Sequence, residues 1–153
     1  MKNILVSACL LGIPCRYDGK SKPCEAVVKL NEKYNLIPVC PEVSGGLPTP
    51  RVPSERIGER VMMRDGRDVT DNYNRGAEYA LKLCRDNGIS LAILKERSPS
   101  CGKGKIYDGT FSGKLTDRDG VTAELLQKGG IRVLSESDVE ELEKIYEGRN
   151  DCK

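Results

Sequence analysis

Short apolar runs alternate with amphipathic stretches along most of the chain. Four of the runs predict β-strands, because they are short, apolar and flanked by turn residues; they cover residues 4–9, 36–40, 91–95 and 131–134. Apolar positions at helical spacing predict helices over about residues 25–34, 70–87, 121–128 and 135–146. Strands that alternate with helices are typical of a parallel sheet. We therefore predict an α/β fold, a single three-layer domain over residues 1–147 with a short, mostly parallel sheet, helices on both faces and small hairpins, followed by a tail at 148–153.

The stretch after the second predicted strand departs from this alternation. Four of the eight prolines and three glycines fall within residues 40–59, which predicts irregular structure. A loop of that length in a compact domain is usually functional or disordered. Pro38 predicts that the second strand lies at a sheet edge or carries a bulge. Asp-Gly pairs at residues 65–66 and 108–109 predict two hairpin turns.

The composition removes several classes of function. The formal net charge is +2, from 25 basic and 23 acidic residues, so there is no electrostatic argument for nucleic acid. With no tryptophan and one phenylalanine, aromatic stacking on bases is poorly supplied. The absence of histidine excludes Ser-His-Asp and Cys-His catalysis and histidine metal sites. No apolar run approaches the ~18 residues that a membrane span requires, so we expect no membrane partner.

The seven cysteines are the main chemical resource of the chain. Their odd number and irregular spacing do not resemble a disulfide framework, and reduced thiols or metal ligands in a cytoplasmic protein fit better. Residues 6–9, "VSAC", match the end of a lipoprotein export signal. The apolar run before them is only about five residues long, whereas such a signal needs ~7–15. We therefore expect a cytoplasmic protein.

Three cysteines fall at or just after the ends of three successive predicted strands. Cys9 closes the first strand, Cys40 closes the second, and Cys101 follows the third. In a parallel sheet these ends lie on one edge, where ligands bind, so the three thiols are expected to face one crevice. Packing is the competing explanation, because free cysteine is often buried, and we assign Cys84 to the core on that ground. Cys15 lies in the loop after Cys9 and is a candidate fourth ligand or redox partner.

Thiolate ligation without histidine suits an iron–sulfur cluster or zinc. A structural zinc site needs four ligands, which here would be Cys9, Cys15, Cys40 and Cys101. Three cysteines suit a [4Fe–4S] cluster in which one iron has no protein ligand and acts as a Lewis acid. Three hypotheses follow: a cluster-dependent enzyme, a protein that stores or delivers iron–sulfur units without catalysis, and a structural zinc module.

Three sequence blocks resemble a small bacterial family, the thiouracil desulfidases. The blocks are "SACLLG" with "CRYDG", "VCPEVSGGLPTPR", and "LKERSPSCG", and the similarity extends from residue 2 to about residue 140. This resemblance implies a [4Fe–4S] cluster held by Cys9, Cys40 and Cys101, with the fourth iron taking the sulfur of a thiocarbonyl substrate. It also implies that Glu42 and Ser98 are the catalytic side chains.

The implied activity is the non-redox removal of sulfur from a thiolated small molecule such as 2-thiouracil, which gives the carbonyl product and sulfide. Glu42 would take a proton from the attacking water, and Ser98 would donate a hydrogen bond to the substrate. From the residues alone, Glu42 is a solvated loop carboxylate and Ser98 a turn residue. Arg16 and Arg51 are candidates for steadying an anion, and residues 102–120 are a candidate lid.

Overall fold

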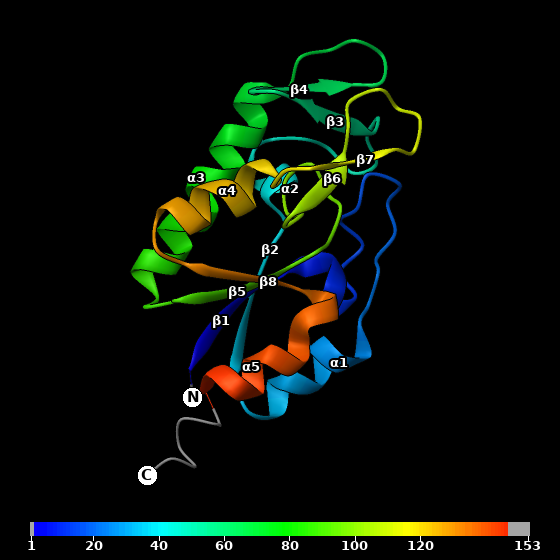
Figure 1. Ribbon diagram of the computed structural model, residues 1–153. Helices are drawn as coiled ribbons and strands as arrows, with labels where there is room; N and C mark the ends of the chain where they lie inside the picture. Colours follow the sequence, from blue (N-terminus) through cyan, green and yellow to red (C-terminus); the bar gives the residue numbers. More distant parts are fainter. Residues whose placement is uncertain (1, 147–153) are drawn as a thin grey trace.

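The computed structural model of the protein describes residues 2–146, so the predicted tail lies outside the described residues. Four parallel strands form the central sheet in the order β2-β1-β5-β8 (Figure 1). The strands are β1 (Asn3–Ser7), β2 (Asn35–Val39), β5 (Leu91–Leu94) and β8 (Arg132–Ser135). All neighbouring pairs are parallel, because each strand is followed by a segment that crosses back over the sheet. The predicted α/β class with a parallel sheet is confirmed.

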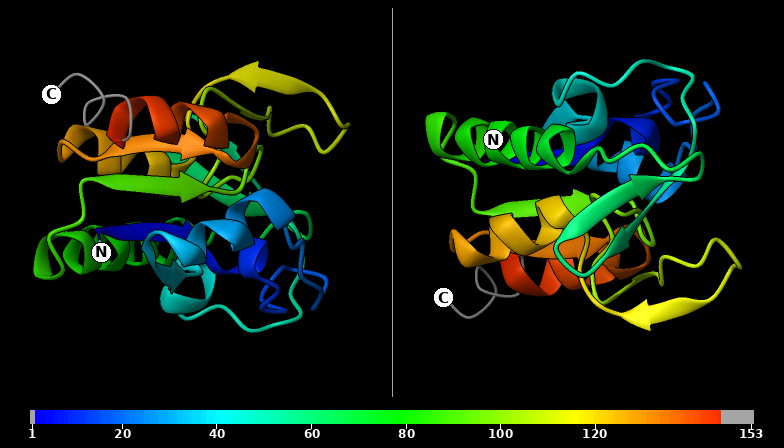
Figure 2. Two further views of the ribbon diagram at one scale, coloured as in Figure 1. Left: turned by 90° about the horizontal axis from the view of Figure 1, so that it is seen from below. Right: turned by 90° about the horizontal axis from the view of Figure 1, so that it is seen from above.

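Helices cover both faces of the sheet (Figures 1 and 2). One face carries α1 (Glu25–Val28) and α5 (Val139–Tyr146), which are in front of the sheet in the left view of Figure 2. The other face carries α3 (Thr70–Asp86) and α4 (Val121–Lys128), in front in the right view.

The alternation of side chains along β1 assigns each residue to one of the two cores. Ile4 and Val6 pack on the α1 and α5 side, whereas Leu5 packs among residues of α3 and α4. All three side chains are fully buried. β1 and β5 therefore have no solvent-facing side, which explains why their sequences are apolar runs without polar alternation.

Two small antiparallel hairpins lie beyond the carboxyl ends of the sheet strands (Figure 1). The first pairs β3 (Ser54–Ile57) with β4 (Arg60–Met63), and the second pairs β6 (Lys105–Tyr107) with β7 (Leu115–Asp117). Parallel sheets bind ligands beyond the carboxyl ends of their strands, so the two hairpins form part of the wall of any site at this edge.

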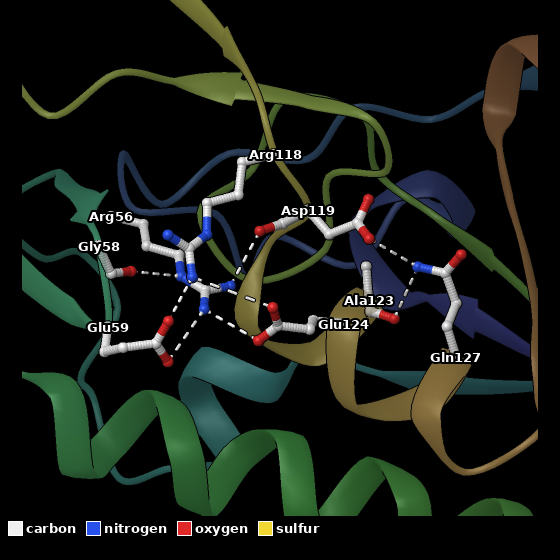
Figure 3. Close-up of polar contacts among 8 residues, drawn as sticks. All are labelled: Arg56, Gly58, Glu59, Arg118, Asp119, Ala123, Glu124 and Gln127. Carbon is white, nitrogen blue, oxygen red and sulfur yellow. Dashed lines mark hydrogen bonds and ion pairs between the residues drawn. The ribbon is translucent and has the colours of Figure 1, made fainter.

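Arg56 joins the first hairpin to α4 (Figure 3). The Arg56 side chain is only 2% exposed. Its guanidinium donates to the carbonyl oxygen of Asp119 and to the carboxylate of Glu124, each at 2.9 Å. A second arginine, Arg118, pairs with Glu59 at the turn of the hairpin. Buried charges need partners of this kind, so the hairpin is held at one position on the body of the protein.

Several predicted boundaries were wrong. The first strand ends at Ser7, and Cys9 lies in a 3-10 turn, η1 (Ala8–Leu11). The helix predicted for residues 25–34 divides into α1 and a second 3-10 turn, η2 (Lys29–Glu32). Apolar spacing does not distinguish these two helix types over so few residues.

The segment 40–59 is also more regular than predicted, because it contains a one-turn helix, α2 (Pro41–Ser44), and β3. Proline at the first turn of a helix is compatible with helical geometry, so Pro41 starts α2 instead of preventing it. The hairpin turn predicted at residues 65–66 is confirmed, because Met62 and Asp68 on either side of it form an antiparallel bridge. The turn between β3 and β4 was not predicted. The hairpin predicted about residues 108–109 is confirmed.

Pro38 lies in β2, which is an edge strand as predicted. No described helix is both long enough and apolar enough to cross a bilayer.

Candidate active site

A cavity of about 760 Å³ opens at the carboxyl edge of the sheet. Its walls come from the segments that follow β1, β2 and β5 and from both hairpins. Segments that are far apart in the sequence therefore meet here, as expected for a ligand site in a parallel α/β fold.

Cys9, Cys40 and Cys101 all line this cavity. Cys9 lies in η1 directly after β1, Cys40 is the residue before α2 at the end of β2, and Cys101 lies in the turn after β5. These three strands are neighbours in the sheet, so the topology brings the thiols together as the sequence predicted. Cys15 lines the cavity as well, and its carbonyl oxygen accepts a weak hydrogen bond from the Cys40 thiol at 3.7 Å.

The surroundings of Cys40 and Cys101 raise the pKa of both thiols and so favour their neutral form when no metal is bound. Burial raises the pKa of Cys101 to about 12, and the nearby charges of Cys40 and Glu42 act in the same direction. A hydrogen bond with Cys15 and burial both raise the pKa of Cys40. A metal ligand must be a thiolate, so binding of a cationic centre would displace these protons and compensate the buried charge.

The donor set fits an iron–sulfur cluster. Within residues 2–146, no three cysteine or carboxylate side chains are grouped as ligands of a single metal ion. A cubane differs from a single ion because each of its thiolates binds a different iron, so its ligands stand further apart. Cysteines on the walls of a wide cavity are compatible with that requirement.

Glu42 lies in the first turn of α2 and faces the cavity. Arg51 donates from Nε to Glu42 Oε1 at 3.0 Å, and the Arg51 side chain is only 2% exposed. The same guanidinium donates to the carbonyl oxygens of Pro48, at 3.1 Å, and Cys15, at 2.9 Å. Arg51 therefore steadies an anion, as predicted, but that anion is a carboxylate of its own chain.

Two glycines fix the position of α2 against α3. A Cβ on Gly76 would lie 1.9 Å from the carbonyl oxygen of Pro41, and one on Gly45 would lie 2.0 Å from that of Asn72. The Asn72 side chain also donates to the Gly45 carbonyl at 2.9 Å. Because Cys40 and Glu42 adjoin this contact, the close approach of the two helices sets where both side chains lie.

Ser98 lines the cavity and shapes the turn that carries Cys101. Its hydroxyl oxygen accepts the backbone N–H groups of Ser100 and Cys101, both at 3.1 Å. A hydroxyl that accepts in this way still has its own hydrogen to donate. The interpretation of Ser98 as a turn residue is therefore correct, and it remains compatible with a donor role in the cavity.

Sequence reasoning missed other residues of the cavity. Tyr73 is buried in α3 and lines the cavity, and its hydroxyl has no hydrogen-bond partner among residues 2–146. Burial raises the pKa of Tyr73, and the charge of Glu42 raises it further. Glu55, Lys95 and Phe111 also line the cavity. Helical spacing alone places Tyr73 on the apolar face of its helix, and nothing in the local pattern marks Glu55 or Lys95. Phe111 falls within the candidate lid of residues 102–120.

Comparison with known proteins identifies the family. A family sequence model described as 2-thiouracil desulfurase matches residues 4–138. The chain belongs to the 2-thiouracil desulfurase family. The matched region contains all five residues that the sequence analysis assigned to the site, namely Cys9, Cys40, Glu42, Ser98 and Cys101.

Two similar proteins support membership of the 2-thiouracil desulfurase family. The uncharacterized protein YbbK of Bacillus subtilis (strain 168) is 44% identical over 149 residues, which cover 91% of this chain and 99% of YbbK. The solved structure of the [4Fe-4S]-dependent thiouracil desulfidase TudS has a TM-score of 0.88 and 51% sequence identity. That match covers 93% of this chain and 95% of the TudS chain.

Proposed function

We propose that this protein is a [4Fe–4S]-dependent desulfidase that removes sulfur from a thiocarbonyl compound such as 2-thiouracil. The observation that carries the proposal is the meeting of Cys9, Cys40 and Cys101 at one cavity, in a chain 51% identical to a thiouracil desulfidase. The overall reaction joins the thiocarbonyl compound with water and yields the carbonyl compound and hydrogen sulfide. It needs no net electron transfer, so no redox partner is required.

We assign Cys9, Cys40 and Cys101 as the ligands of the cluster. A [4Fe–4S] cluster held by these three thiolates would have one iron without a protein ligand, which would supply a Lewis acid for the soft sulfur of a thiocarbonyl group. Cys15 lies in the same cavity, and we place it outside the ligand set.

Glu42 is the general base in this scheme. Its Oε1 accepts a hydrogen bond from Arg51 Nε, and we assign Oε2 to the proton transfer. The carboxylate takes a proton from a water molecule as the water oxygen adds to the thiocarbonyl carbon. The C–S bond then breaks as the added oxygen releases its remaining proton and becomes the carbonyl oxygen, and both protons of the water leave with the sulfur as hydrogen sulfide.

Ser98 is the hydrogen-bond donor. Its oxygen accepts two backbone N–H groups, so the remaining hydroxyl hydrogen can be directed toward a substrate heteroatom. A fixed donor of this kind stabilises negative charge that develops on the substrate as water adds.

The test of the base is Glu42→Gln in anaerobically reconstituted protein. The variant should keep its absorption near ~400 nm, because the ligands are intact, and should lose at least ~100-fold in sulfide release from 2-thiouracil. Glu78→Gln, on the exposed side of α3, is the matched control and should behave as wild type. Undiminished turnover by Glu42→Gln would remove the base from the scheme.

The test of the ligand set compares alanine variants at four cysteines. Loss of iron and colour is expected for Cys9→Ala, Cys40→Ala and Cys101→Ala, because two thiolates rarely hold a cubane. Cys15→Ala should keep both, whereas a four-cysteine zinc site would be lost with any of the four. A colourless Cys15→Ala protein, or a brown Cys40→Ala protein, would contradict the assignment.

We further propose that the protein acts on small molecules in the cytoplasm and not on nucleic acid. The near-neutral charge argues against nucleic acid, and the free cysteines of residues 2–146 support a cytoplasmic location.

A further inference from the structure

The loop between β6 and β7 brings the single phenylalanine of the chain to the cavity. Phe111 is partly exposed and lines the cavity together with Tyr107, at the end of β6. The guanidinium of Arg64 lies over the Phe111 ring, 5.5 Å from its centroid. A cation on one face of an aromatic ring leaves the second face for another partner.

The backbone at Phe111 has a conformation that L-residues avoid. Phe111 has φ 54°, and among residues 2–146 the one other non-glycine residue with positive φ is Arg97, at φ 66°. Both line the same cavity. Such conformations persist only where surrounding contacts hold them, and they concentrate at functional sites.

A carboxylate holds Phe111 in this conformation. Glu55 Oε1 accepts the backbone N–H of Gly109 at 2.9 Å and that of Phe111 at 3.1 Å. Gly109 in turn lies so close to β3 that a Cβ there would approach a side-chain carbon of Ile57 to 2.4 Å. The loop is thus fastened to the first hairpin at its backbone, next to the aromatic side chain.

The first hairpin is itself held to the body of the protein. Arg56, the residue after Glu55, binds the carboxylate of Glu124 in α4 (Figure 3). A continuous set of contacts therefore runs from α4 through the hairpin to the backbone of Phe111. These contacts hold the backbone of Phe111 at the cavity, which a loop that only covered the surface would not require.

We propose that Phe111 is a specificity-determining residue that stacks on the planar ring of a heteroaromatic thiocarbonyl substrate. This inference rests on the proposed desulfidase function. Stacking favours a flat, unsaturated ring over a puckered, saturated one, because only the flat ring offers its whole face to the phenyl group. Phe111 would thereby select aromatic substrates independently of the groups that bind sulfur and move protons.

The experiment compares 2-thiouracil with 5,6-dihydro-2-thiouracil, which keeps the thiocarbonyl and both N–H groups but has a saturated, puckered ring. Phe111→Leu replaces the ring with an apolar side chain that has no aromatic face. The free-energy cost of the positive φ at this position is then the same in wild type and variant. In the cluster-loaded enzyme, Phe111→Leu should lower kcat/KM for 2-thiouracil by about 10-fold or more. The same substitution should lower kcat/KM for the dihydro compound by less than about 3-fold. Phe111→Tyr keeps the ring and should stay within about 3-fold of wild type on both.

Anaerobic calorimetric binding of the two compounds to the same three proteins gives a second readout. An equal loss on both compounds, or no loss on either, would overturn the stacking role, because a purely structural loop does not distinguish the rings. If the wild-type protein releases no sulfide from 2-thiouracil, the proposed function fails. Calorimetry then still decides whether Phe111 selects the flat ring.

Discussion

Arg51 shows how one side chain organises the predicted site. Its guanidinium contacts the candidate base Glu42, the loop at Pro48 and the backbone of Cys15, and it is almost fully buried. Arginine suits this place because its planar fork presents several donors in fixed directions, whereas lysine is a single charged point on a flexible stem. The carboxylate and the loop that carries Cys15 are therefore positioned by the same group.

Replacing Arg51 should affect both stability and turnover. Arg51→Ala leaves buried acceptors unpaired and is expected to lower the free energy of unfolding by at least ~1–3 kcal/mol, measured by urea denaturation. Arg51→Lys keeps the charge without the fork and should still lose about 10-fold or more in turnover. Arg67→Ala removes an exposed ion pair with Asp65 and is the control, with an expected change below about 1 kcal/mol. If Arg51→Ala were as stable as Arg67→Ala, the organising role of Arg51 would be wrong.

Cys84 predicts a specific pH dependence of stability. Burial in the core raises the pKa of Cys84 to about 11 from the usual 9.0. The folded state therefore holds this proton more tightly than the unfolded state. The resulting stability is fully present below about pH 9 and is lost as the pH rises to about 11, by an amount on the order of 2 kcal/mol.

Denaturation of Cys84→Ala and Cys84→Ser between pH 8 and 11 measures this contribution. The two variants differ in stability at neutral pH because their side chains pack differently. Neither titrates, so both should show the same shallower decline with pH than wild type. If the free energy of unfolding fell equally with pH in wild type and both variants, the Cys84 thiol would not contribute to the pH dependence of stability.

At the level of elements, the contact between α2 and α3 determines the position of the candidate base. Pro41 starts α2, Glu42 follows it, and Gly76 of α3 lies directly against the Pro41 carbonyl group. Close backbone approach of this kind requires glycine.

Gly76→Ala separates helix propensity from packing. Propensity alone predicts a gain of up to about 1 kcal/mol, because alanine is the better helix former. The Cβ would lie 1.9 Å from the Pro41 oxygen, so we expect the opposite sign, a fall in the unfolding temperature together with reduced turnover as α2 shifts. Arg75→Ala, at the exposed neighbouring position, should change neither. A more stable, fully active Gly76→Ala protein would contradict the proposed packing.

The elements that could be predicted from sequence are the periodic ones. The four sheet strands, α3 and α4 were predicted within one or two residues, and the meeting of Cys9, Cys40 and Cys101 follows from parallel topology. α2 and β3 were missed because a one-turn helix and a four-residue strand in a proline-rich segment have no detectable period. For the same reason the pairing of Arg51 with Glu42 and the clamp of Glu55 on Phe111 could not be predicted. Both depend on loop conformations that only the three-dimensional structure shows.

At the level of the whole molecule, most residues of the two apolar cores on either side of the sheet are not predicted ligands of the cluster. Among the residues that the structure describes, twelve buried ones from Leu5 to Val133 form the core under α3 and α4, and Cys101 is the one predicted ligand in that set. The core on the other face includes Cys9, but its other members come mainly from the strands, α1 and α5. Packing of this extent stabilises a domain of this size without a metal.

Removal of the cluster should therefore abolish activity and leave the fold. After chelation, far-ultraviolet circular dichroism should be unchanged, and thermal unfolding should stay cooperative at a lower midpoint, because bound ligands add stability by mass action. Small zinc domains behave differently, since they unfold when metal is removed. An apo-protein without a cooperative transition would show that the cluster is a folding element.

Pro38 has a consequence for association between copies of the protein. It is the fourth of the five residues of β2, at the outer margin of the sheet, and its side chain is exposed. Since proline lacks an amide hydrogen, this edge strand has one donor fewer for pairing near its carboxyl end. A strand from another chain that tried to extend the sheet here would meet that gap, and β-type self-assembly along this margin is disfavoured by a single residue.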